Sequence, residues 1–133
     1  MQVGSSRGRK KQGTVNIFFD ILDTLLTEDG DHRPHAREVV LKLTELGHGV
    51  YLWSTAGEGY ATNAAWVLGV ENLVKGCFLK GQPPEGITVD YVVDDDEGMV
   101  KEHGGCVVRP YEGDPWDSEL LGVLEAVEAS ELD

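Results

Sequence analysis

The chain of 133 residues, 41% of them hydrophobic, is long enough for one domain with a hydrophobic core. Its net charge of −13 indicates a body that repels nucleic acid and attracts metal cations. No apolar run approaches the roughly 20 residues that span a bilayer, and no apolar segment of a secretory signal is visible, so we expect a cytoplasmic protein without a membrane partner.

The N-terminal residues 1–13 differ in composition from the rest of the chain. They show no apolar periodicity, and we predict a disordered basic tail ahead of a single domain over residues 14–133. The tail could contact an anionic partner, although a solvated tail or a cloning remnant is the simpler interpretation. Its basic residues are Arg7, Arg9, Lys10 and Lys11.

Strands and helices are predicted to alternate along the domain. Pro34 suits the first turn of a helix, where its missing N–H is not needed, and Gly47 ends that helix. This alternation predicts an α/β fold, a three-layer α/β/α sandwich around a central parallel sheet. The predicted strands are 14–19, 49–53, 74–79, 89–93 and 106–108, and the predicted helices are 34–46, 58–68, 97–103 and 117–132, the last capped by Asp117.

Three of the predicted strands are followed by side chains that could bind or attack a phosphoryl group. Asp20 follows the first strand, Ser54 and Thr55 follow the second, and Lys80 follows the third. Taken singly, each has a simpler interpretation, as a turn residue, a helix cap or a lysine extended along apolar surface. Because the carboxyl ends of parallel strands share one edge of a sheet, however, we expect these groups to converge.

A run of three carboxylates, Asp94 to Asp96, follows the fourth predicted strand. Adjacent carboxylates repel one another unless they are solvated or bound to a cation. Oxygen ligands of this kind suit a hard divalent ion, and Mg²⁺ is the predicted cofactor. Glu97 either joins this group or only begins the next helix.

Together these segments resemble the haloacid dehalogenase superfamily of hydrolases. The first motif of that family is usually D-x-D-G-T-L, and here it is DILDTL from Asp20 to Leu25. The second, an apolar strand ending in Ser or Thr, is similar to YLWS ending at Ser54, and its continuation TAGEGYA resembles the capless aspartate phosphatases. The third motif matches Lys80, and the fourth matches VVDD ending at Asp95.

The resemblance implies a phosphatase mechanism and a fold without a cap domain. Asp20 would attack the phosphoryl group and carry it as an aspartyl phosphate, and Lys80 would offset the developing charge. The implied catalytic residues are Asp20, Ser54 and Lys80; the phosphate-binding residues are Ser54, Thr55 and Lys80; and the Mg²⁺ ligands are Asp20, the carbonyl of Leu22, Asp94 and Asp95.

One position departs from the family pattern. The second Asp of the first motif is usually the general acid and base, and here that position is Leu22. General acid–base catalysis contributes about 10²–10⁴ in rate, so we expect slow turnover. Asp23, one residue later, is the alternative proton donor.

The loops that could hold a cap are short, at Thr27–Arg33 and Gly81–Thr88. The resemblance therefore implies an open site, which suits a phosphorylated small molecule or protein, or a lid supplied by a second copy in a homo-oligomer.

Two other functions compete with a phosphatase. A non-catalytic domain of the same fold, binding a phosphorylated or protein partner, is favoured by Leu22 and disfavoured by the retention of the other motif residues. A response-regulator receiver also uses an Asp and a Lys, but its acidic pair precedes the nucleophile, whereas here the acidic cluster comes last.

Overall fold

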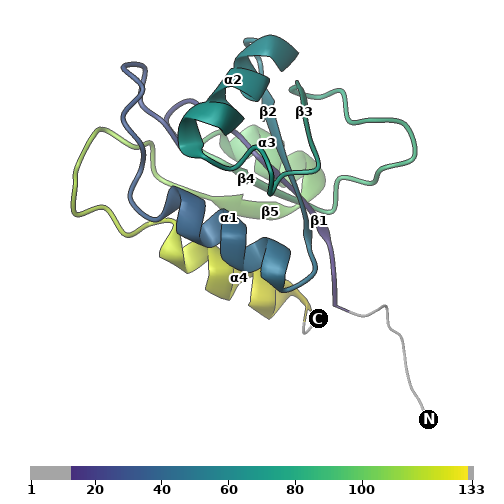
Figure 1. Ribbon diagram of the computed structural model, residues 1–133. Coiled ribbons are helices and arrows are strands. Elements are labelled where there is room, and N and C mark those ends of the chain that lie inside the picture. The colour runs from purple at the N-terminus through teal and green to yellow at the C-terminus, as the bar shows by residue number, and fades with distance from the viewer. Residues whose placement is uncertain (1–12, 132–133) are drawn as a thin grey trace.

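A parallel sheet of five strands lies at the centre of the protein in the computed structural model, which describes residues 13–131 (Figure 1). The strand order is β3-β2-β1-β4-β5, so β1 is the central strand. The predicted α/β sandwich with a central parallel sheet is confirmed. The strands are β1 (Asn16–Phe19), β2 (Gly49–Ser54), β3 (Gly76–Leu79), β4 (Tyr91–Asp94) and β5 (Gly105–Val107), and the helices are α1 (Ala36–Glu45), α2 (Glu58–Leu68), α3 (Glu97–His103) and α4 (Leu121–Glu131).

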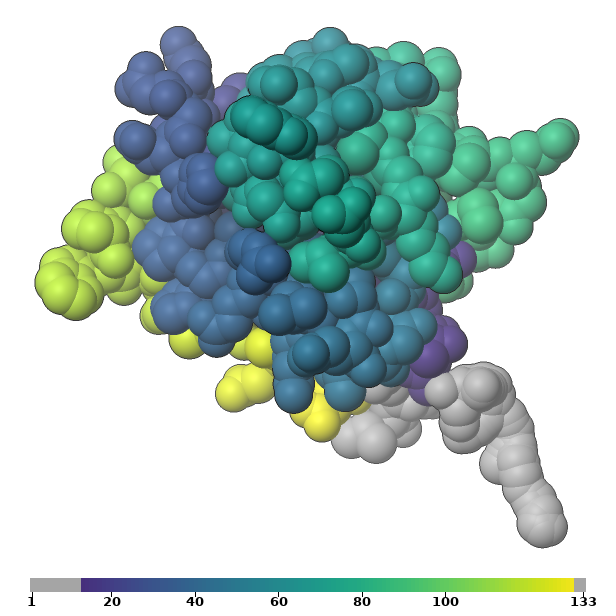
Figure 2. Space-filling model, viewed as in Figure 1, coloured from purple at the N-terminus to yellow at the C-terminus, as the bar shows by residue number. Residues whose placement is uncertain are grey.

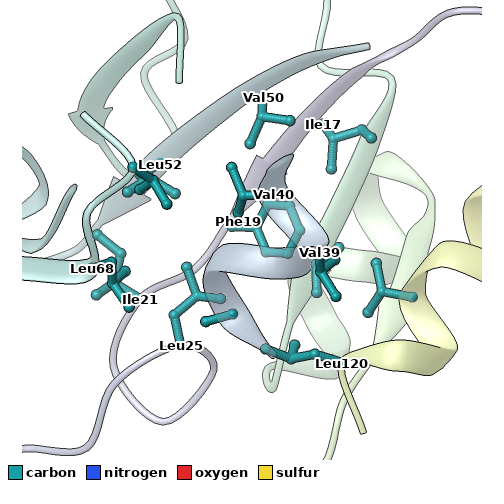
Figure 3. Packing of buried hydrophobic residues seen from close by; sticks show 14 of the residues in the cluster. Ile17, Phe19, Ile21, Leu25, Val39, Val40, Val50, Leu52, Leu68 and Leu120 are labelled. Atoms are coloured by element: carbon teal, nitrogen blue, oxygen red, sulfur yellow. The ribbon is translucent and has the colours of Figure 1, made fainter. Parts of the chain in front are cut away.

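Helices cover both faces of the sheet. On the face that carries Ile17 and Phe19, side chains of α1, α2 and α4 complete the larger core cluster (Figure 3). Figure 1 shows α1 beside α4 on this side. On the opposite face, Phe18 stacks on Tyr51 with ring centroids 4.6 Å apart, and α3 covers this smaller cluster through Met99.

The central position of β1 explains its apolar run from Ile17 to Phe19. Phe18 and Phe19 point to opposite faces of the sheet, and both are fully buried. A strand that is buried on both faces has no solvent-facing side that could be polar. Burying one phenylalanine side chain contributes about 1.5–3 kcal/mol to stability, so β1 anchors both layers.

The register of the strands brings their carboxyl ends to one level. Phe19 pairs with Leu52 of β2 and with Val93 of β4. The backbone N–H of Asp20 continues the ladder and donates to the Val93 carbonyl at 2.9 Å. Asp20 therefore lies at the same end of the sheet as Asp94.

Two predicted helix starts are wrong. α1 begins at Ala36 rather than Pro34, because His35 has a left-handed backbone with φ 72°. α4 begins at Leu121 rather than Asp117, whose carboxylate pairs with a buried arginine and accepts the N–H of Glu119 in the turn before the helix. The predicted helix end at Leu132 and tail residues 1–12 lie outside the described residues. Within the described chain, no helix combines the length and the apolar character needed to cross a membrane.

Several strand boundaries also differ from prediction. β1 begins at residue 16 rather than 14, β2 continues by one residue to 54, and β5 covers 105–107 rather than 106–108. β3 begins at Gly76 rather than Val74, because the N–H of Val74 closes a turn onto the Val70 carbonyl. β4 begins at Tyr91 rather than Val89, and the preceding Asp90 side chain accepts a hydrogen bond at the start of β1.

Gly105 is required where β5 approaches β4. Its φ is 147°, and an added Cβ would collide with the carbonyl oxygen of Val92. Only glycine combines this backbone conformation with so close a strand contact.

Candidate active site

Asp20 lies at the carboxyl end of the central strand and is almost completely buried, with 6% of its surface exposed. The chain turns sharply after it, because the backbone N–H groups of Thr24 and Leu25 both donate to the Ile21 carbonyl. This turn places the Thr24 hydroxyl 2.9 Å from Oδ2 of Asp20, to which it donates. This hydrogen bond fixes the orientation of the Asp20 carboxylate.

Lys80 reaches this carboxylate from the edge of the sheet. It follows β3, and its backbone N–H donates to the Ser54 carbonyl at 2.9 Å. Its ammonium Nζ lies 2.7 Å from Oδ1 of Asp20 and 2.9 Å from Oδ2 of Asp94. A single cation therefore bridges two carboxylates from different strands.

The three consecutive acids that begin at the last residue of β4 have two different roles. Asp94 is fully buried, and its Oδ1 accepts the backbone N–H of Asp96 at 2.8 Å. Asp95 is half-buried and faces the site. Asp96 is exposed and caps α3, since its side chain accepts the N–H of Gly98 at 2.9 Å. Glu97 is the first residue of that helix.

Burial raises the pKa of both central carboxyl groups. It raises the pKa of Asp20 to about 7, against the hydrogen bond with Lys80 and with the help of the nearby Asp94 charge. It also raises the pKa of Asp94, against the Asp96 N–H and the contact with Lys80. Burial alone would lower the pKa of Lys80, but the two carboxylates hold it above its ordinary value. The single positive charge of Lys80 does not balance the carboxylates, so the site carries excess negative charge.

The carboxylates fit a divalent cation. Asp20, Asp94 and Asp95 each offer an oxygen, and the three oxygens lie within 4.8 Å of one another. Oδ2 of Asp94 is buried, and the ammonium of Lys80 lies 2.9 Å from it. A set of three carboxylates, which are all oxygen ligands, suits Mg²⁺.

Leu22 stands where the resembled family has its general acid, and its side chain is 42% exposed. The N–H of Leu26 donates to the Ile21 carbonyl, and the N–H of Asp23 donates to the Leu26 carbonyl. Neither bond uses the Leu22 carbonyl. Asp23 adopts a left-handed backbone with φ 63°, at the position where the family usually has glycine.

Ser54 ends β2 beside the carboxylates and is buried. Its Oγ accepts the N–H of Ala56 at 3.0 Å, which turns the chain away from the strand. Thr55 follows on the surface, and α2 begins only at Glu58, as the sequence indicated. Gly57 caps α2 without a side-chain hydrogen bond. Ser54 is tied to the site through its carbonyl, which accepts the N–H of Lys80.

Three further residues support the site without having been predicted to do so. Tyr60, in the first turn of α2, has a pKa raised by burial and by the charges of Asp20 and Asp23. Arg33 is 1% exposed and pairs with Asp117 at 2.9 Å. No local pattern identifies this pair, because its partners are 84 positions apart.

An acidic hollow of about 360 Å³ opens beside Asp23. It lies between the loop after β1 and the loop between β5 and α4, and Figure 2 shows the second loop, in yellow-green, projecting from the body. An anionic substrate that approached from this side would meet further negative charge. The acids in its lining are Asp23, Glu28, Asp29, Asp31 and Glu112.

No protein-family model matches this chain, and a search of curated proteins finds no significant match. The resemblance to the haloacid dehalogenase superfamily therefore depends on the motifs and on the placement of their residues.

Proposed function

We propose that this protein is a Mg²⁺-dependent phosphohydrolase of the haloacid dehalogenase type, with Asp20 as its nucleophile. The observation that carries the proposal is the group formed by Asp20, Lys80 and Asp94. A nucleophilic carboxylate at the end of the central strand, a lysine 2.7 Å away and a second buried acid are the parts that aspartyl phosphoryl transfer needs.

The reaction would proceed in two displacements at phosphorus. A carboxylate oxygen of Asp20 forms a bond to phosphorus while the ester P–O bond breaks, and the leaving alkoxide takes a proton from water. A second water then attacks phosphorus, the bond to Asp20 breaks, and inorganic phosphate and the free carboxylate result. Lys80 and the Ser54 hydroxyl would hold the phosphoryl oxygens during both steps.

Mg²⁺, held by Asp20, Asp94, Asp95 and the Leu22 carbonyl, would offset the repulsion between the carboxylate and the anionic substrate. Without a carboxylate at position 22, proton transfer to the leaving group depends on water. Slow turnover is therefore part of the proposal, and esters with good leaving groups should react best.

The substrate would be a phosphorylated small molecule or protein. The loops after β1 and β3 carry no helix or strand that could form a cap. An uncapped site admits large substrates, and self-association could supply a lid. The acidic body disfavours nucleic acid. A cytoplasmic location remains a prediction.

A panel of aryl and alkyl phosphate esters, with and without Mg²⁺, tests the proposal. The parent should release phosphate only with Mg²⁺, and Asp20→Asn should abolish release. Asp90→Asn, the same substitution at the opposite end of the sheet, is the matched control and should retain activity.

The second candidate is a non-catalytic domain that binds a phosphorylated partner, and Leu22 is the observation that favours it. If no ester in the panel is hydrolysed while Mg²⁺ binds, this candidate replaces the first.

A further inference from the structure

A buried arginine joins two loops behind the carboxylates. The guanidinium of Arg33 makes two hydrogen bonds to Asp117, from Nε at 2.9 Å and from Nη2 at 3.1 Å. Nη1 donates to the Thr24 carbonyl at 3.3 Å, and Nη2 also donates to the Arg109 carbonyl at 2.8 Å. The guanidinium lies 5.4 Å from the ring centroid of Tyr111.

Both loops lead directly to the site. On one side, the Thr24 hydroxyl donates to Asp20. On the other, the loop after β5 begins with Val108, whose N–H donates to the Asp94 carbonyl at 3.0 Å. The pair formed by Arg33 and Asp117 therefore connects the turn after Asp20 with the chain beside Asp94.

We propose that the ion pair of Arg33 and Asp117 is a positioning device that holds the Thr24 hydroxyl on the Asp20 carboxylate. The effect on catalysis rests on the proposed function, whereas the effect on Thr24 does not. Arg33 is a positioning residue, because its guanidinium contacts the Thr24 carbonyl and not the reacting atoms. A planar guanidinium can bind a carboxylate and two carbonyls at once, in a way that a lysine ammonium cannot.

Thr24 connects the guanidinium of Arg33 with the carboxylate of Asp20. The residue is fully buried, and its β-branched side chain has few allowed rotamers. Its carbonyl is held by Arg33 and its N–H by Ile21, so the direction of the hydroxyl is fixed from both ends of the residue. Loss of the guanidinium contact should let the turn shift and the hydroxyl leave Asp20.

The first test measures the side-chain rotamer of Thr24 by NMR three-bond couplings in the full chain. The parent should show one rotamer, whereas Asp117→Asn and Arg33→Lys should show averaging between rotamers. Asp90→Asn is the matched control: it is the same substitution at the opposite end of the sheet, where the Asp90 side chain accepts the N–H of Asn16, and it should keep a single Thr24 rotamer. A single Thr24 rotamer in both Asp117→Asn and Arg33→Lys would overturn the proposal, whether or not the protein has phosphatase activity.

The second test uses phosphate release and a double-mutant cycle. Asp117→Asn should lower kcat by about tenfold to a hundredfold with little change in KM, as expected for a misplaced nucleophile. In a Thr24→Val background the same substitution should have little further effect, because the hydroxyl that it positions is gone. Equal losses of kcat in both backgrounds would show that the pair does not act through Thr24. A parent without activity would refute the proposed function, and the rotamer test would still decide the positioning role.

Discussion

Asp20 should make the metal-free protein less stable as the pH rises, and Asp20→Asn should remove that loss. Burial raises the pKa of Asp20 from 3.8 to about 7, despite the hydrogen bond with Lys80. Between these values the folded state keeps a proton that the unfolded state has lost, so stability falls with rising pH. The full difference corresponds to about 4 kcal/mol, of which about 3 kcal/mol lies between pH 5 and pH 8.

Urea unfolding in EDTA at pH 5 and pH 8 measures this effect. Asp117 contributes in the opposite sense: Arg33 lowers its pKa, so its stabilisation is present above pH 3.8 and is lost on further acidification. The comparison is therefore between the slopes of the parent and of Asp20→Asn, with Asp90→Asn as the control that should keep the parental slope. If Asp20→Asn falls with pH as steeply as the parent, the inferred cost of burying the Asp20 charge is incorrect.

Four other substitutions test the metal site, the missing acid and the sheet. Mg²⁺ should stabilise the folded state by about 2.7 kcal/mol at a concentration of 100 Kd, seen as a higher Tm, and an unchanged Tm shift in Asp94→Ala would exclude Asp94 as a ligand. Leu22→Asp should raise phosphate release by roughly tenfold to a hundredfold while Asp23→Ala changes it little; loss of activity in Asp23→Ala would instead make Asp23 the proton donor. Gly105→Ala should lower the free energy of unfolding by more than about 1 kcal/mol, because its Cβ meets the Val92 carbonyl, and a parental urea midpoint would contradict this.

The parallel sheet could be predicted from the sequence because the strand patterns and the helix patterns along the chain agree with each other. Short runs rich in β-branched and aromatic residues alternate with helical patterns, and a parallel sheet is the arrangement that satisfies both. The same topology brings the ends of β1, β2, β3 and β4 to one edge, so the positions of Asp20, Ser54, Lys80 and Asp94 followed from chain order alone.

The starts of two helices could not be predicted from the sequence. Asp117 precedes a helical pattern and has the chemistry of a cap, yet Arg33, 84 positions away, binds its carboxylate. The carboxylate also accepts the N–H of Glu119, and the helix itself begins four residues after Asp117, at Leu121. Pro34 likewise suits a first turn, but the left-handed backbone at His35 delays α1 to Ala36. At Asp117 the partner comes from a loop distant in the sequence, which no local propensity encodes.

Neither the sequence pattern nor the geometry of the site explains why residue 22 is a leucine rather than an acid. Leu22 is exposed beside buried acids, so nothing in the packing requires an apolar side chain there. Activity measurements on Leu22→Asp therefore decide whether this position limits the rate.

Detection of the covalent intermediate tests the central claim most directly. The protein would be mixed with Mg²⁺ and an aryl phosphate, quenched in acid during turnover, digested and examined by mass spectrometry. If Asp20 is the nucleophile, the peptide that contains it should carry one phosphoryl group, which hydroxylamine removes and which Asp20→Asn lacks. Release of phosphate at the parental rate by Asp20→Asn, or turnover with no phosphoryl group on that peptide, would contradict the assignment.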